Sequence, residues 1–156
     1  MPWRFLVVLS ILLSASSLPP GLAAEASGYT LVFQRSKGAL PSGHRRWVLQ
    51  VRRAGQTLAS WTAVSGTRQA QGSDRRWSPG NGAPLPVGTY NVGRPERWAG
   101  SWWIDLNPRF STTRSALGIH TCLPGSGCIC LPSRTDTEAV ARWIHKTGLS
   151  RLEVLN

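Results

Sequence analysis

Sulfur-containing and acidic residues are scarce in this chain of 156 residues. It has one methionine, three cysteines and seven acidic residues. Because the first cysteine is Cys122, we expect no N-terminal lipoprotein anchor. Asp105 and Asp136 lack the paired arrangement of carboxylates that glycoside hydrolysis needs, which argues against a glycosidase. The sequence also lacks internal repeats and low-complexity segments, so a single ordinary domain is expected.

A long hydrophobic run is missing as well. The apolar segment Phe5–Leu13 would span about 14 Å as a helix, roughly half of the hydrocarbon core of a membrane. It follows Arg4 and precedes two prolines and a group of small residues, a pattern typical of a secretory signal peptide. We therefore expect residues 1–24 to be a signal peptide and residues 25–156 to form one exported domain in the periplasm or cell wall. We expect no stable membrane insertion.

Positive charge is abundant and comes almost entirely from arginine. Sixteen of the 18 basic residues are arginine, and without residues 1–24 the chain keeps 17 basic and seven acidic residues, a net charge of +10. Planar guanidinium groups favour carboxylate and phosphate partners. In an exported protein this charge favours the cell wall or a membrane surface, whereas the compartment argues against nucleic acid. Because the arginines are dispersed, charge alone does not identify the partner.

Several short segments rich in β-branched and aromatic residues are bounded by Gly, Pro and polar clusters. The pattern predicts a mainly β fold, a sandwich or barrel of strands with one C-terminal helix. Residues 68–86 are too rich in Gly, Pro and Asn for regular structure, and a loop of this length is usually functional or mobile. The predicted strands are Tyr29–Gln34, Arg45–Arg53, Thr57–Gly66, Val87–Gly93, Ser101–Leu106, Ala116–His120 and Arg151–Leu155.

The segment 133–150 predicts the helix. Thr135 or Asp136 is expected to cap its N-terminus, and an apolar stripe that includes Val140 follows. Gly148 is expected to adopt the left-handed conformation that ends many helices.

All three cysteines lie between positions 122 and 130, close to His120. Three cysteines in an exported protein cannot all pair within one chain, so one thiol is left over. One interpretation is a structural disulfide with a spare cysteine. A second is a zinc site formed by His120, Cys122, Cys128 and Cys130, although the Cys-x-Cys spacing and an oxidising compartment argue against it. We therefore expect no metal.

The third interpretation is a cysteine nucleophile. The glycines of the segment Gly125–Cys128 allow consecutive backbone N–H groups to converge on one oxygen, which is what an oxyanion hole requires. His120 ends a predicted strand, and its imidazole is placed to take the thiol proton if the intervening loop folds back. We expect a thiolate–imidazolium pair with a lowered cysteine pKa.

The segments "ALGIH" and "GSGCICL" resemble the signature of the L,D-transpeptidase catalytic domain, the YkuD-like family, in which an Ile-His-Gly segment precedes Ser-His-Gly-Cys-Ile-Arg-Leu. Two upstream segments agree: "AVSGT" resembles a strand that ends in Ser-Thr-Gly, and "APLPVGTYNV" resembles a Thr-Pro-x-Gly-x-Tyr turn. The order of these motifs is kept over residues 57–131. The resemblance is greatest to the short, divergent branch of the family.

The resemblance implies a role for each matched position. Cys128 would attack the carbonyl at the L-centre of meso-diaminopimelate in peptidoglycan, release D-Ala and form a thioester, with His120 as base. Gly127 and Cys128 would supply the oxyanion hole. An amine of a second stem peptide would resolve the thioester into a cross-link, whereas water would give L,D-carboxypeptidase activity. No cofactor is implied.

This sequence departs from the family pattern at several positions. Thr121 stands where the family has glycine, and Ser126 takes the place of a second histidine. Cys130 replaces an arginine that helps to hold the site or the substrate, and either Arg114 or Arg134 is a candidate to substitute for it. Trp103 is a further candidate for contact with sugar rings or peptide.

The pairing of the cysteines bears on the nucleophile. We favour a Cys122–Cys130 disulfide that braces the loop around a free Cys128. A Cys128–Cys130 bond would block the nucleophile instead, and the sequence leaves both open.

From the sequence we therefore expect a monomeric, exported L,D-transpeptidase that acts on peptidoglycan. A non-enzymatic cell-wall-binding module with a disulfide-braced loop is the main alternative. A toxin delivered into rival cells is disfavoured by the signal peptide.

Overall fold

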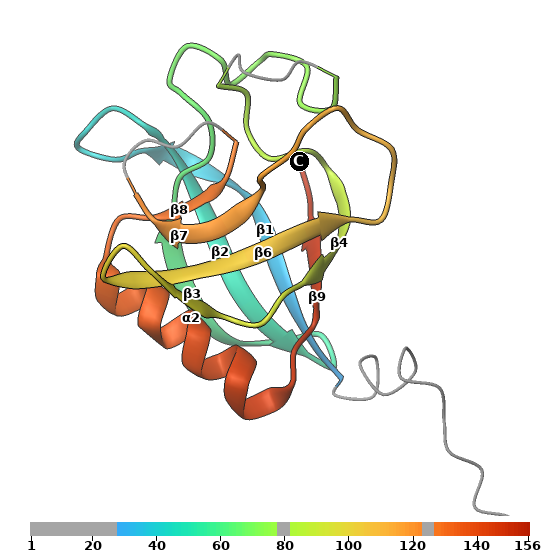
Figure 1. The fold of residues 1–156 in the computed structure, drawn as a ribbon. Helices are drawn as coiled ribbons and strands as arrows, with labels where there is room; N and C mark the ends of the chain where they lie inside the picture. The colour runs from blue at the N-terminus through green and yellow to red at the C-terminus, as the bar shows by residue number, and fades with distance from the viewer. Residues whose placement is uncertain (1–27, 78–81, 123–126) are drawn as a thin grey trace, which may run out of the picture.

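The computed structural model describes residues 28–77, 82–122 and 127–156. These residues form a mainly β domain, in which one sheet curls into a nearly closed barrel and a single helix lies near the C-terminus (Figure 1). The predicted fold class is confirmed. The predicted signal peptide, residues 1–24, lies outside the described residues.

The elements follow one another in the order β1 (Tyr29–Ala39), β2 (Arg45–Arg53), β3 (Gln56–Ala63), β4 (Gly88–Val92), β5 (Glu96–Trp98), β6 (Ser101–Pro108), β7 (Gly118–Thr121), β8 (Ile129–Leu131), α2 (Arg134–Thr147) and β9 (Arg151–Val154). Along the sheet the strand order is β3-β2-β1-β9-β4-β6-β7-β8, and β5 pairs with β6 outside this path. Most neighbours are antiparallel, but β1 with β9 and β7 with β8 are parallel.

A single bridge brings the two ends of this path together. Val64, just after β3, donates its N–H to the Cys130 carbonyl of β8 at 2.9 Å and accepts the Cys130 N–H at 2.9 Å. These two backbone hydrogen bonds nearly close the sheet at this point. The bridge also helps to fix the position of β8, which contains Cys130 and directly follows Cys128.

Alternation of apolar and polar residues explains which face of each strand is buried. In β2, Trp47, Leu49 and Val51 are fully buried, whereas the intervening residues are partly exposed. Phe33 of β1 stacks on Trp47 with ring centroids 4.8 Å apart. Tyr90 of β4 is also fully buried and donates its hydroxyl hydrogen bond to the Pro86 carbonyl at 2.7 Å. These side chains fill the interior of the barrel.

The helix α2 begins two or three residues earlier than the sequence suggested. Ser133 is its N-cap: it is extended, and its Oγ accepts the Asp136 N–H at 3.3 Å. The prediction of Thr135 or Asp136 as the cap was wrong, because both already lie in the first helical turn. Gly148 ends the helix at φ +65°, as expected. The buried residues of the helix include Val140 and Ile144, and the helix packs against β6, β7 and β8.

Two short strands were missed in the sequence. The strands β5 and β8 have three residues each, too few for a periodic pattern to be visible. The strand β5 exists because Glu96, Arg97 and Trp98 pair with β6 across a tight turn at Ala99–Gly100. The strand β8 is held by β7 on one side and by the Val64 bridge on the other.

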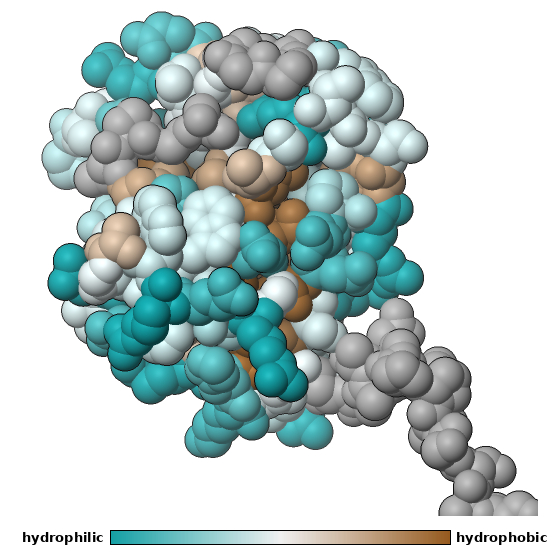
Figure 2. Space-filling model, in the orientation of Figure 1, coloured by the Kyte–Doolittle hydropathy of each residue, from teal (hydrophilic) through white to brown (hydrophobic). Residues whose placement is uncertain are grey.

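Figure 2 shows hydrophobic residues in a strip at the middle of the face drawn in Figure 1, framed by hydrophilic residues. Large apolar side chains that stay exposed include Trp77, with 53% of its surface accessible, and Trp98, with 52%. Among the described residues, no helix has both the length and the apolar character that crossing a bilayer requires.

We predict that Ser133→Ala lowers the free energy of unfolding by about 1 kcal/mol, because the Asp136 N–H loses its capping acceptor. Thr135→Ala is the matched control and should change it by less than about 0.5 kcal/mol. Urea unfolding followed by circular dichroism measures both values. A larger loss of unfolding free energy in Thr135→Ala than in Ser133→Ala would place the cap at Thr135.

Candidate active site

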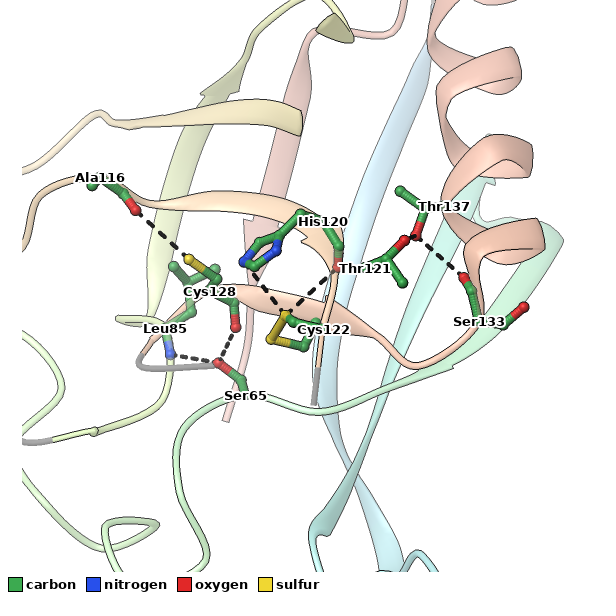
Figure 3. The surroundings of a disulfide bond; sticks show 10 residues. Ser65, Leu85, Ala116, His120, Thr121, Cys122, Cys128, Ser133 and Thr137 are labelled. Atoms are coloured by element: carbon green, nitrogen blue, oxygen red, sulfur yellow. Dashed lines mark hydrogen bonds between the residues drawn. A yellow bond between two sulfur atoms is a disulfide. The ribbon is translucent and has the colours of Figure 1, made fainter. Parts of the chain in front are cut away.

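The parallel pairing of β7 with β8 places the sequence-predicted histidine and cysteine together. Ile119 lies opposite Ile129, and His120 opposite Cys130. Cys128 immediately precedes β8, and its sulfur interacts with the backbone N–H of Gly118 in β7. Because side chains alternate along a strand, His120, Cys128 and Cys130 lie on the same face of this pair. Figure 3 shows the imidazole between the Cys128 thiol and the disulfide.

The disulfide joins Cys122 to Cys130 and leaves Cys128 as a buried free thiol. This is the pairing that we favoured from the sequence. Sγ of Cys122 lies 3.4 Å from Nε2 of His120, so the disulfide packs directly on the imidazole (Figure 3). The ligand atoms of His120, Cys122 and Cys130 lie within 4.8 Å of one another. However, disulfide sulfurs are not the thiolates that bind zinc.

Cys128 is held as a protonated thiol. Its Sγ donates to the Ala116 carbonyl at 3.6 Å, and only 8% of the residue is exposed. Burial raises the pKa of the Cys128 thiol above its ordinary value, although the Gly118 N–H and the Arg114 guanidinium act in the opposite direction. The thiol is therefore neutral near pH 7.

His120 is held as a neutral imidazole. Burial lowers its pKa below 6.5, and the backbone of Thr121 opposes this shift only in part. Its Nδ1 is buried and makes no hydrogen bond to the described residues. The expected thiolate–imidazolium pair with a lowered cysteine pKa is therefore wrong for the resting site. Burial penalises both charged forms, so the proton stays on sulfur until charge can be stabilised elsewhere.

Of the two candidate arginines, Arg114 is the one that lies beside Gly127 and Cys128. It is 8% exposed, and its guanidinium donates to the carbonyls of Arg75 and Ala83, each at 3.0 Å. A weaker contact reaches the carbonyl of Pro84 at 3.4 Å. Arg114 thereby holds both described parts of the segment 68–86, residues 68–77 and 82–86, next to Cys128. Its charge lowers the thiol pKa, which favours a developing thiolate.

Arg134, the other sequence candidate, lies elsewhere. It is the first residue of α2, and its guanidinium lies next to Gly100 in the turn between β5 and β6. Trp103 of β6, predicted to contact substrate, pairs directly with His120, and their ring centroids are 5.0 Å apart. Trp103 thus borders the imidazole.

Gly127 is required by both conformation and space. Its φ is +88°, and a Cβ built on it would lie 1.7 Å from Nη2 of Arg114. Only glycine combines this conformation with such close contact to the guanidinium. The chain therefore turns sharply into Cys128, as an oxyanion hole made of the Gly127 and Cys128 amides would require. Ser126 lies outside the described residues, so its predicted role has no structural description.

Ser65 is a site residue that the sequence reasoning did not single out. It is 1% exposed, donates its hydroxyl hydrogen to the Cys128 carbonyl at 2.8 Å and accepts the Leu85 N–H at 2.9 Å. The hydroxyl joins the segment after β3, the segment before β4 and Cys128 (Figure 3). Its place in the motif "AVSGT" was the available signal.

A chain of hydroxyl groups supports the other side of the site. Thr121 Oγ1 lies 2.8 Å from both Ser101 Oγ and Thr137 Oγ1, which joins β7 to β6 and α2. Ser101 and Thr137 are buried. This network accounts for threonine after His120, where the resembling family has glycine. Spacing alone could not reveal it, because the three residues are far apart in the sequence.

We predict that Gly127→Ala lowers the free energy of unfolding by at least about 2 kcal/mol, since Arg114 must leave its carbonyl partners. Gly38→Ala is the matched control: Gly38 has φ +81° but open space around it, so its cost is the backbone strain alone. Chemical unfolding measures the difference between the two variants. Equal costs would mean that Arg114 tolerates the methyl group.

Alkylation of the single free thiol tests the neutral resting pair. The raised pKa of Cys128 predicts that the iodoacetamide rate at this residue is half-maximal above pH 9.0, the ordinary value for a thiol. Mass spectrometry of the alkylated peptide at each pH gives the profile. A rate that reaches its plateau by pH 7 would indicate a preformed thiolate.

Comparison of the chain with protein-family models, with curated proteins and with solved structures returned no match. A function for this chain must therefore be inferred from its site and from the order of its motifs.

Proposed function

We propose that this protein is a cysteine L,D-transpeptidase that acts on the stem peptides of peptidoglycan. The observation that carries the proposal is the buried free thiol of Cys128, which lies on the same face of β7 and β8 as His120, while the other two cysteines form a disulfide. This arrangement fits the order of motifs that resembles the L,D-transpeptidase family. A segment whose only role is to carry a structural disulfide would not need a third, unpaired cysteine next to a turn that requires glycine.

The first half-reaction forms a thioester. Sγ of Cys128 attacks the carbonyl at the L-centre of meso-diaminopimelate, and neutral His120 takes the thiol proton as the S–C bond forms. The backbone amides of Gly127 and Cys128 stabilise the oxyanion. The C–N bond then breaks, the imidazolium returns its proton to the leaving amine, and D-Ala departs.

The second half-reaction resolves the thioester. His120 accepts a proton from the amine of a second stem peptide, the amine attacks the thioester carbonyl, and Cys128 leaves as a thiol after receiving that proton. The product is a 3→3 cross-link. If water takes the place of the amine, the same steps give L,D-carboxypeptidase activity.

The resting neutral pair suits this chemistry. A neutral imidazole can accept a proton, and a protonated thiol is protected from oxidation until substrate binds. Charge is created only in the transition state, where the oxyanion donors and Arg114 can stabilise it. Arg114 also keeps the segment 68–86 next to the nucleophile through its three carbonyl contacts.

We predict that Cys128→Ser and His120→Gln each lower D-Ala release from a disaccharide-tetrapeptide by at least about a thousandfold, because nucleophile and base act as one unit. Mass spectrometry of the products also separates 3→3 dimers from tripeptides, and hence transpeptidation from hydrolysis. His44→Gln is the control, since His44 is far from the site in sequence and contacts Ser42 at the surface. Full turnover by both site variants would refute the assignment.

A carbapenem distinguishes an enzyme from the alternative of a wall-binding module. An enzyme of this class should gain one covalent adduct on Cys128, detectable in the intact mass and lost in Cys128→Ser. A module that only binds the wall would retain affinity for peptidoglycan sacculi without acylation.

A further inference from the structure

We propose that Trp98 is a positioning residue for His120: together with Trp103 and the disulfide, it holds the imidazole ring in place and keeps water from it. The catalytic part of this inference rests on the proposed role of His120 as base. The structural part does not, and it is tested separately below.

Three aromatic rings contact one another at the site. The Trp98 ring meets His120 edge to face, with centroids 5.6 Å apart and an interplanar angle of 87°. Trp103 lies 5.0 Å from His120 at 38°. The two indoles also contact each other at 5.8 Å. The imidazole therefore contacts two indoles that are oriented differently to it.

The disulfide bounds the imidazole at another edge. Sγ of Cys122 lies 3.4 Å from Nε2 of His120. Rotation of the ring about its Cβ–Cγ bond would bring it against an indole or against sulfur. Trp98 lies on the short strand β5, which pairs with β6 outside the main path of the sheet. Trp103 lies on β6, and the disulfide closes a covalent loop. Of these three neighbours of the imidazole, Trp98 is therefore the least firmly held.

A tight turn delivers Trp98 to this position. Ala99 has φ +47° and Gly100 has φ +72°, the combination found in two-residue hairpins of type I′. A non-glycine residue with positive φ is unfavourable. The chain nevertheless adopts it at Ala99, which pairs Trp98 with Ser101 and directs the indole to the face that carries His120.

Core packing does not account for Trp98, because 52% of its surface remains exposed. An indole this exposed contributes less to stability than a buried one. What it does cover is His120, whose pKa is lowered chiefly by burial. Removal of the Trp98 ring should therefore admit water to the imidazole and free its rotation.

Charged groups on the surrounding elements give no competing explanation. Those groups include Glu96 and Arg97 on β5, Asp105 on β6, Arg114 and Cys128 next to β8, and the charged residues of α2: Arg134, Asp136, Glu138, Arg142, His145 and Lys146. None contributes to the lowered pKa of His120, which comes from burial, opposed by the Thr121 backbone. Asp105 is engaged by Nε1 of Trp103 at 2.6 Å.

The first test is an NMR titration of the histidine side chains, with His120 assigned by comparison with His120→Gln. In Trp98→Ala the pKa of His120 should rise toward 6.5, because the charged form regains water. Trp98→Phe keeps a ring and should give a smaller rise. Trp77→Ala removes an equally exposed indole, 53% accessible, from the segment 68–86 and should leave the titration unchanged.

An unchanged or lowered pKa in Trp98→Ala would overturn the proposal. If Trp98→Ala fails to fold, Trp98→Phe and Trp98→Leu give the comparison, since both retain an apolar side chain at the same place. The titration needs no substrate, so it is independent of the proposed reaction.

The second test is the rate of carbapenem acylation at Cys128 as a function of pH. For Trp98→Ala the acid limb should move to higher pH, and the pH-independent rate should fall about tenfold because the base is less well oriented. Acylation that is identical in Trp98→Ala and the unmodified protein overturns the inference but leaves the proposed function intact. If the His120 titration shifts in Trp98→Ala but neither protein is acylated, the structural part of the inference stands and the proposed function is refuted.

Discussion

The site depends on the parallel pairing of two very short strands, β7 and β8. Ile119 opposite Ile129 sets the register, and a shift by one residue would move His120 and Cys128 to opposite faces. Four residues against three cannot hold such a register alone. The Cys122–Cys130 disulfide and the Val64 bridge across the barrel add the missing constraint, so the bridge that nearly closes the barrel also supports the site.

Burial gives the candidate site its chemical character. It raises the pKa of Cys128 and lowers that of His120, so the pair rests neutral in a place where either charge would be poorly solvated. In the proposed reaction, such a thiol would lose its proton only as a substrate carbonyl takes up the developing charge. Arg114 adds a fixed positive charge beside the sulfur, and its own position is secured by backbone carbonyls rather than by an acid.

Much of the architecture could be predicted from local pattern. Long strands such as Arg45–Arg53 show alternation, and Gly148 is a recognisable helix end. The cysteine cluster stood out because the chain has so few sulfur atoms, and the pairing favoured from the sequence is the one present. Short strands held by their neighbours escaped notice, and Ser133 was passed over as the cap because Thr135 and Asp136 are equally good capping residues in the sequence alone.

The sequence by itself determined a mainly β domain and a histidine–cysteine constellation, since periodicity, composition and spacing are local properties of the chain. Only the tertiary structure decided that Arg114 rather than Arg134 lies beside Cys128, and that Ser65 holds the Cys128 carbonyl. It also decided that the resting pair is neutral. These outcomes depend on contacts between residues far apart in the chain and on how much water the fold excludes, and neither is encoded in any short segment.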